Sequence, residues 1–180
     1  MTVIFQEDTK AAPVNLLIKK LLEAKWYHRA GFKDAVTESH MQSFFERLHV
    51  NEYELKWVKK EELNEMIGRF SFRDSKAWEK LKQIPDQLKE KIDSDYTMAQ
   101  LEKLADFLPE AVFHPAFDHA FQQFGDEKIV RYLTVNSMYL ALLICTAELA
   151  GEGECFEPIL RIIESGHVPV GIDGNVIYLI

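Results

Sequence analysis

Cysteine is scarce in this sequence, in which Cys145 and Cys155 are the only two among 180 residues. Two thiols cannot build the disulfide framework that stabilises many small secreted domains. The start of the chain also lacks the basic segment followed by an apolar one that marks a secretory signal. Because free thiols suit a reducing compartment, we expect a cytoplasmic protein, with Cys145 in a buried helix and Cys155 in a polar loop.

Long hydrophobic runs are absent as well. In the most apolar segment, Arg131 and Glu148 bracket fewer uncharged residues than the roughly 20 that a membrane-spanning helix needs. Polar residues such as Thr134 and Ser137 interrupt this segment, so we expect no membrane contact. Its apolar residues fall on every side of a helical wheel, as in a helix buried in a core. The sequence therefore predicts a buried central helix over about residues 126–150.

Basic residues are few in the C-terminal half. Residues 92–180 contain 4 Lys and Arg against 14 Asp and Glu, whereas residues 1–91 contain 17 and 15. Phosphate binding needs Lys and Arg, so we expect no direct contact with nucleic acid. An acidic surface attracts a basic protein partner, but it also favours solubility without any partner. Both interpretations remain open at this point.

Helical periodicity is the main pattern in the sequence. Apolar residues recur at spacings of three and four along most of the chain, which predicts amphipathic helices. We expect a mainly α, single-domain multi-helix bundle over residues 1–180, built around the central helix. The expected helices cover residues 13–31, 34–48, 61–70, a segment that begins at Asp74 or Ser75 and ends or restarts at Pro85, residues 97–108, 109–124 and 126–150, and a last helix that contains Phe156 and ends at Gly166.

The C-terminal segment, residues 167–180, has strand patterning instead. It contains two apolar runs around Asp173-Gly174, and Asp-Gly between apolar runs is a strong signal for a β-hairpin. Pro169 cannot donate to a strand ladder, so we expect its strand at a sheet edge.

A hairpin alone is marginally stable in water, so this one should pack on the helices or pair with a further strand. The candidate strands are Val3–Phe5 and Tyr53–Trp57, and the latter alternates apolar with charged residues. Residues 51–59 also fit a helical spacing that continues into the next segment, so their assignment stays open.

Motifs for catalysis are weak. The sequence has no Gly-x-Ser-x-Gly elbow, no P-loop and no complete dinucleotide-binding pattern. The best candidate is His114-Pro-Ala-Phe-Asp118-His119, since His114 and Asp118 would share a helix face with His119 beside them, and such groups hold divalent metals. An exposed helical ion pair explains the same pattern. We expect a non-enzymatic protein without cofactor, with a metal-dependent hydrolase as the alternative.

Acidic residues gather in three places that could bind a basic partner. Glu148, Glu152, Glu154 and Glu157 surround one expected loop, Asp93 and Asp95 mark another, and Asp173 lies at the tip of the hairpin. Charge complementarity would speed association with a basic protein. A solvated rim is the alternative interpretation.

A third possible function is that of a helical scaffold or chaperone-like protein. Phenylalanines recur at spacings of four, four and three from Phe113 through Phe117 and Phe121 to Phe124. Such a stripe, or the hairpin edge, would then mediate self-association.

The C-terminal sequence ILRIIESGHVPVGIDGNVIYLI, residues 159–180, resembles the end of bacterial immunity proteins from polymorphic-toxin and contact-dependent growth inhibition systems. In those proteins a helix that ends in glycine leads to a short strand with proline and glycine, then to a turn and a last apolar strand. The matching residues are Ile162, Gly166, Val168, Pro169, Gly171, Asp173, Gly174 and Ile177–Ile180.

The resemblance implies a cytoplasmic, non-enzymatic protein that binds a cognate toxin domain tightly. Many such toxins are basic nucleases, which would suit an acidic inhibitor. The resemblance transfers no catalytic residue. The predicted function is therefore toxin neutralisation by occlusion of the toxin's active site or substrate-binding face.

Overall fold

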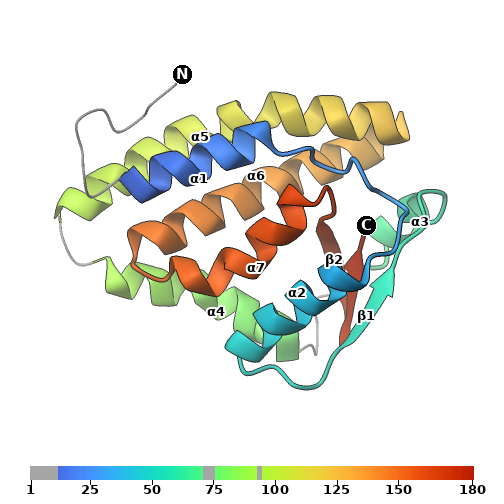
Figure 1. Cartoon of the computed structure of the whole chain (residues 1–180), viewed down its shortest axis with the longest axis horizontal. Helices are drawn as coiled ribbons and strands as arrows, with labels where there is room; N and C mark the ends of the chain where they lie inside the picture. The colour runs from blue at the N-terminus through green and yellow to red at the C-terminus, as the bar shows by residue number, and fades with distance from the viewer. Residues whose placement is uncertain (1–11, 71–75, 93–94) are drawn as a thin grey trace.

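The protein is mainly α-helical with a small C-terminal sheet, as the sequence predicted (Figure 1). The structure is a computed structural model that describes residues 12–70, 76–92 and 95–180. The described elements are α1 (Ala12–Glu23), α2 (Ala35–Arg47), β1 (Glu54–Trp57), α3 (Leu63–Ile67), α4 (Lys76–Lys91), α5 (Asp95–Phe124), α6 (Glu127–Leu149), α7 (Gly153–Glu164), β2 (Pro169–Asp173) and β3 (Val176–Leu179).

Helix α6 is the predicted central helix. It runs through the middle of the molecule, with α5 and α1 on one side and α7 and α4 on the other (Figure 1). The side chain of Asp126 accepts a hydrogen bond from the backbone N–H of Ile129 (3.1 Å), which satisfies one of the open donors at the helix start. The predicted range of 126–150 is therefore confirmed to within one residue at each end.

The polar side chains inside α6 are satisfied within the core. The hydroxyls of Thr134 and Ser137 donate to the carbonyls of Val130 (2.7 Å) and Leu133 (3.0 Å), one turn back. The Tyr27 hydroxyl donates to the same Leu133 carbonyl (2.7 Å) and lies 2.7 Å from the Ser137 hydroxyl oxygen. Because each buried hydroxyl has a partner, the polar interruptions of this segment do not prevent its burial.

Length and composition alone would also allow α6 to cross a membrane, since its most apolar window has a mean hydropathy of 1.4. The expectation that no segment is long and apolar enough to span a membrane is therefore wrong by these two criteria. Half of that window (50%) is buried inside the protein. A helix that is apolar on all sides is typical of protein cores as well as of membranes.

The sheet confirms the predicted hairpin and settles the open assignment of residues 51–59. The strand order is β1-β3-β2, with β1 parallel and β2 antiparallel to β3. Pro169 lies in the edge strand β2, as its missing N–H requires. Gly174, with φ of +57°, is the first of two turn residues between β2 and β3. The hairpin thus gains its third strand from Glu54–Trp57.

Helix α1 ends much earlier than the predicted residue, Gly31. It stops at Glu23, and the indole N–H of Trp26 donates to the Leu21 carbonyl (3.0 Å), one of the acceptors left open at a helix end. Tyr27 has φ of +61°, which is outside the helical region. Both aromatic side chains are fully buried, so their packing in the core fixes a turn that the apolar spacing alone did not indicate.

Helix α5 is continuous where the sequence predicted two helices, 97–108 and 109–124. It includes both Pro109 and Pro115. A proline inside a helix costs about 3 kcal/mol or more. Leu108, Val112 and Ala116 are fully buried, and α6 is the main neighbour of α5. Burial along this face compensates for the lost hydrogen bonds, so the prediction of a boundary at Pro109 was wrong.

Smaller differences concern three other helices. Helix α3 is shorter than the predicted range 61–70, because Phe70 leaves it and its ring packs against Gly171, where a Cβ would lie 2.6 Å from the ring. Helix α4 continues through Pro85. Cys155 lies in the first turn of α7 rather than in a loop. The expected strand Val3–Phe5 and the expected caps Asp74 and Ser75 lie outside the described residues.

A buried histidine joins the end of α7 to the sheet. The backbone N–H groups of Gly166 and His167 donate to the carbonyls of Ile163 (3.0 Å) and Ile162 (3.2 Å), which closes α7 as predicted. The His167 side chain is fully buried, with Nε2 at 4.0 Å from Asp34 Oδ2. Neither ring nitrogen makes a hydrogen bond of normal geometry with a described residue. Burial lowers the pKa of His167 below its ordinary value of 6.5.

Stability should therefore fall as the pH drops below about 6.5. In that range the unfolded chain takes up a proton at His167 that the folded protein disfavours, so unfolding is promoted. We expect the His167→Gln variant to have a flatter dependence of unfolding free energy on pH between neutral and mildly acidic conditions, measured by urea titration. His114→Gln, at an exposed histidine of α5, is the control. Equal slopes in the wild type and in His167→Gln would contradict this account.

The Tyr27 hydroxyl should contribute measurably to stability. Tyr27→Phe removes its two buried hydrogen-bonding contacts to α6, so we expect a loss of about 1–2 kcal/mol in unfolding free energy. Tyr139→Phe is the matched control, because Tyr139 is half-exposed and no hydrogen bond joins its hydroxyl to a described residue. A Tyr27→Phe variant as stable as Tyr139→Phe would show that the hydrogen bonds from Tyr27 to α6 do not contribute to the unfolding free energy.

Candidate functional site

Three of the predicted acidic residues line one cleft. Helices α1, α6 and α7 enclose a volume of about 230 Å³ that opens to the surface. The carboxylates of Glu148, Glu154 and Glu157 line it, together with the buried apolar side chains of Ile144, Phe156 and Leu160. The full lining is Leu17, Lys20, Ile144, Glu148, Gly153, Glu154, Phe156, Glu157, Leu160 and Arg161. We call this feature the acidic cleft.

The sharp turn between α6 and α7 positions the Glu148 carboxylate. Gly151, with φ of +76°, lies in this turn. A Cβ at Gly153 would lie 1.7 Å from Glu148 Oε2, so the carboxylate occupies space that any other residue would fill. It thereby lies over the first residue of α7, where the helix dipole favours a negative charge. Because Gly153 has no side chain, there is room for the Glu148 carboxylate at this position beside the cleft.

The two cations of the cleft, Lys20 and Arg161, form salt bridges with carboxylates other than those of Glu148 and Glu154. Lys20 forms a salt bridge with Glu164 (3.3 Å). Arg161 pairs with both Glu157 (3.4 Å) and Glu164 (3.3 Å). By contrast, no cation among the described residues forms a salt bridge with Glu148 or Glu154. These two carboxylates are therefore available to an external cation.

Glu152 faces away from the acidic cleft. It forms a salt bridge with Lys91 of α4 and lines a separate pocket that also contains Arg47 and Lys80. Arg47, the last residue of α2, also contacts α7, since it pairs with Glu157 (3.9 Å) and donates to the backbone carbonyl of Glu154. The outer side of α7 is therefore a mixed-charge surface rather than the uniformly acidic one that the sequence suggested.

The remaining predicted acidic residues lie elsewhere. Asp173 lines a groove with Glu62 and Glu65 of the α3 region. Asp95 is in the first turn of α5, and Asp93 lies outside the described residues. The structure thus gathers Glu148, Glu154 and Glu157 only. The buried apolar side chains and the contribution of α1 were missed, because a sequence does not reveal which helices enclose a cleft.

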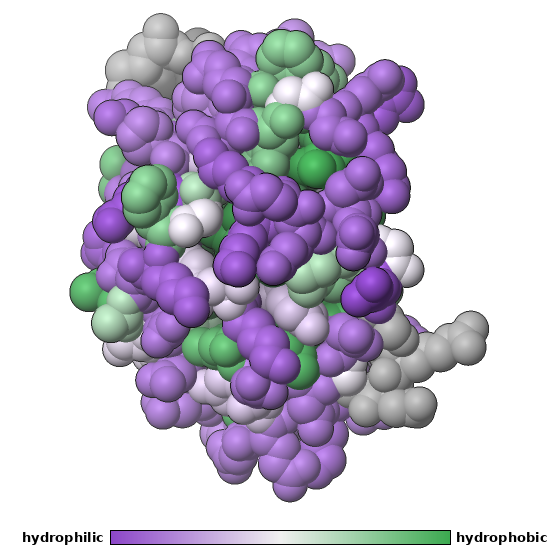
Figure 2. Space-filling view, turned by 90° about the vertical axis from the view of Figure 1, so that its right-hand side faces the viewer, coloured by the Kyte–Doolittle hydropathy of each residue, from purple (hydrophilic) through white to green (hydrophobic). Residues whose placement is uncertain are grey.

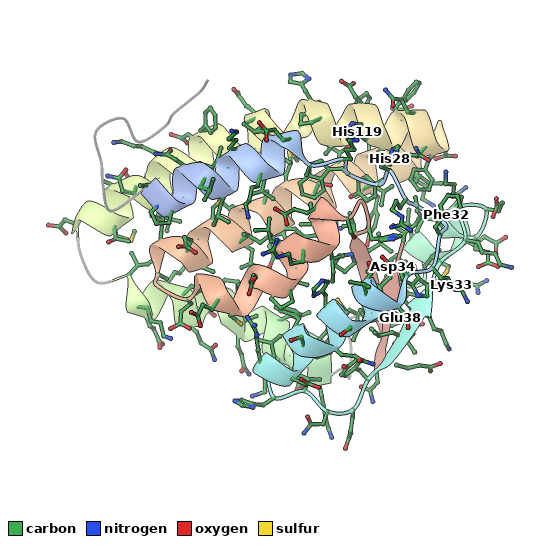
Figure 3. All side chains as sticks on the ribbon, viewed as in Figure 1. His28, Phe32, Lys33, Asp34, Glu38 and His119 are labelled. Carbon is green, nitrogen blue, oxygen red and sulfur yellow. The ribbon has the colours of Figure 1, made fainter. Side chains whose placement is uncertain are left out.

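The alternative metal site does not form a cluster. His114 and Asp118 are exposed on α5, and His119 is partly buried. Burial is the main cause that lowers the pKa of His119, and the nearby His28 adds to it (Figure 3). Across residues 12–70, 76–92 and 95–180, no three His, Cys, Asp or Glu side chains lie in positions to hold a metal ion. The geometry therefore gives the metal-dependent hydrolase no support.

The aromatic stripe of α5 is only partly buried. The rings of Phe113 and Phe117 stack at 5.6 Å, and those of Phe117 and Phe121 at 6.1 Å. Phe113 and Phe121 are 39% and 56% exposed. Phe124 is also partly buried, but it packs edge-on against the fully buried Tyr27 (6.4 Å). Three of the four phenylalanines therefore form a partly exposed row.

The surface elsewhere is mixed. On the face that Figure 2 shows, hydrophilic side chains surround small and separate apolar patches. Patches of this kind are normal for a folded protein and do not by themselves mark a binding site.

Comparisons with known proteins identify no relative. A scan of protein-family models found no matching family, and searches of curated proteins and of solved structures found no match to this chain. The functional assignment therefore depends on the geometry described above.

Proposed function

We propose that this chain is a non-enzymatic protein-binding module that holds a lysine or arginine side chain of a basic partner in the acidic cleft. The observation that carries the proposal is the combination of buried apolar side chains with two carboxylates, Glu148 and Glu154, that form no salt bridge with a described residue. The aliphatic stem of the partner's side chain would lie on Leu17 and Leu160, and its cation would reach the carboxylates.

We further propose that the partner is a toxin domain and that the chain is its cytoplasmic immunity protein. The C-terminal resemblance and the excess of acidic residues in the second half of the chain support this choice. Many such toxins act on nucleic acid and carry basic surfaces. An acidic protein on that surface would occlude the substrate, and charge complementarity would make association fast.

The test starts with the partner. Tagged protein is used to isolate it from the source cells, and the products of neighbouring open reading frames are expressed alongside. We expect one stoichiometric basic partner that is toxic when expressed alone and harmless when this chain is co-expressed. The variant Glu148→Gln/Glu154→Gln should then bind it about 10- to 100-fold more weakly, as measured by calorimetry.

Asp106→Asn/Glu110→Gln is the matched control, since it removes the same charge from an exposed face of α5. It should leave Kd within about twofold of the wild type. Equal weakening by both double variants would mean that net charge alone matters. Wild-type affinity in the cleft variant would exclude the acidic cleft from the interface.

A self-associating scaffold is the second candidate, favoured by the partly exposed row of stacked rings at Phe113, Phe117 and Phe121. If the row joins two copies, sedimentation velocity should detect a dimer at high protein concentration, and Phe121→Ser should abolish it. A chain that remains monomeric at every concentration would exclude this candidate.

A further inference from the structure

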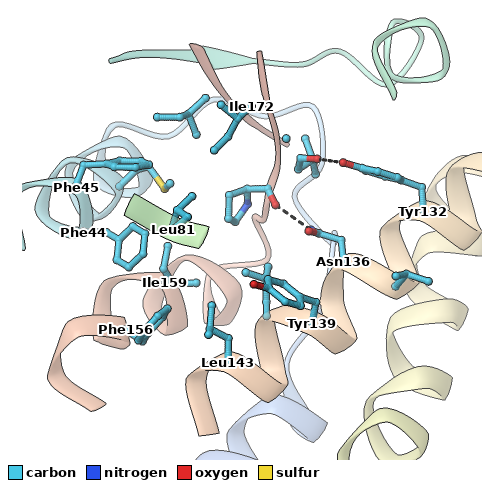
Figure 4. A pocket seen from close by; sticks show the side chains of 17 residues that line it. Phe44, Phe45, Leu81, Tyr132, Asn136, Tyr139, Leu143, Phe156, Ile159 and Ile172 are labelled. Atoms are coloured by element: carbon cyan, nitrogen blue, oxygen red, sulfur yellow. Dashed lines mark hydrogen bonds between the residues drawn. The ribbon is translucent and has the colours of Figure 1, made fainter. Parts of the chain in front are cut away.

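A second hollow of the molecule differs in chemistry from the acidic cleft. It has a volume of about 390 Å³ and lies between α2, α4, α6, α7 and strand β2. Figure 4 shows the rings of Phe44, Phe45 and Phe156 on one side, with Tyr132 and Asn136 of α6 on the other. Phe156 also lines the acidic cleft, so one buried ring forms part of the wall of both. We call this second hollow the apolar cavity.

Two of the polar side chains that line the apolar cavity, Tyr132 and Asn136, hydrogen-bond to the protein backbone. The hydroxyl of Tyr132 donates to the Val170 carbonyl, and the side-chain amide of Asn136 donates to the Pro169 carbonyl (2.9 Å) (Figure 4). Both carbonyls belong to the irregular part of β2, where the register shifts between Pro169 and Gly171. These bonds attach β2 to α6, and they occupy the Tyr132 hydroxyl proton and one of the two N–H groups of the Asn136 amide.

The apolar cavity also has no charged group to neutralise a ligand. Its lining contains no Asp, Glu, Lys, Arg or His. Burial raises the pKa of Tyr132 to about 12 and raises the pKa of Tyr139 as well, so both hydroxyls stay neutral. Tyr139 and Val135 are 50% and 60% exposed and mark the mouth. A carboxylate or an ammonium inside would lose its hydration without gaining a partner.

The wall offers aromatic partners instead. The rings of Phe44 and Phe45 lie 5.5 Å apart at 67°, and those of Phe44 and Phe156 lie 5.5 Å apart at 51°. Rings at such angles present both edges and faces to a neighbour. For size, a cavity of about 150 Å³ holds one benzene molecule, so the apolar cavity has room for about two rings.

We propose that the apolar cavity is a binding site for a small, uncharged aromatic molecule of about two rings. The site is independent of the proposed protein partner, because it opens beside Val135 and Tyr139 rather than at Glu148. The aromatic rings occupy the space between α2, α6 and β2, and any polar substituent stays at the mouth beside the Tyr139 hydroxyl.

The test uses two fluorescent probes that share one naphthalene ring system, neutral dansylamide and anionic dansyl sulfonate. Both gain fluorescence when they leave water. We expect saturable binding of the neutral probe with one molecule per chain. The sulfonate should bind with an affinity at least about tenfold lower, because the cavity has no cation to pair with its charge. Bound neutral probe should also raise the temperature of unfolding.

Val135→Trp is the decisive variant, since a larger side chain at this exposed position covers the mouth without disturbing the core. It should lower the affinity for the neutral probe by about tenfold or more. Leu16→Trp is the matched control, because Leu16 is similarly exposed (58%) on α1 and does not line the cavity. It should bind as the wild type does. Thermal unfolding confirms that both variants are folded.

Three outcomes would overturn the proposal. They are the absence of saturable binding of the neutral probe, equal or tighter binding of the sulfonate, and wild-type affinity in a folded Val135→Trp variant. The last outcome would place the probe on another surface, such as the partly exposed row on α5. None of these results depends on the acidic cleft, so failure here and failure of the proposed function remain distinguishable.

Discussion

The burial of the apolar side chains of α6, apart from an exposed strip that includes Val135 and Tyr139, is the constraint on which the rest of this structure depends. A helix that is apolar on all sides is stable in water only if other elements cover it. Helices α1, α5 and α7 provide this cover with their apolar faces. The same burial requires that Thr134 and Ser137 find partners inside, which the helix's own carbonyls and Tyr27 supply. The fold is thus a set of amphipathic layers around one helix.

Both hollows arise where this cover is incomplete. At the end of α6 the chain reverses through Gly151 into α7, and α1 closes the third side to form the acidic cleft. On the other side of Phe156, the side chains of Tyr132 and Asn136 fasten β2 to α6 and leave the apolar cavity between them. The two sites share a wall but differ in electrostatics, because only the first has ionised groups among its lining residues.

The sequence was informative where a local rule determines the structure. Asp126 capped the central helix, and Asp173-Gly174 located the hairpin, because capping and turn chemistry depend on neighbouring residues alone. It misled where long-range packing prevails, as with Tyr27 at the end of α1 and Pro109 inside α5. The candidate site was predicted in part. The carboxylates around the α6–α7 turn were found, whereas their separation into paired and unpaired groups depends on helices far apart in the chain.

Binding of a lysine-like cation by the acidic cleft can be tested without the partner. Titration with n-butylammonium reproduces the aliphatic stem and the ammonium group, while NMR of the side-chain carboxyl carbons reports on each glutamate separately. We predict saturable shifts at Glu148 and Glu154, with only small, non-saturating changes at exposed carboxylates such as Asp106 and Glu110. Uniform changes at all carboxylates would contradict this prediction, because they would show a general response to salt rather than a site.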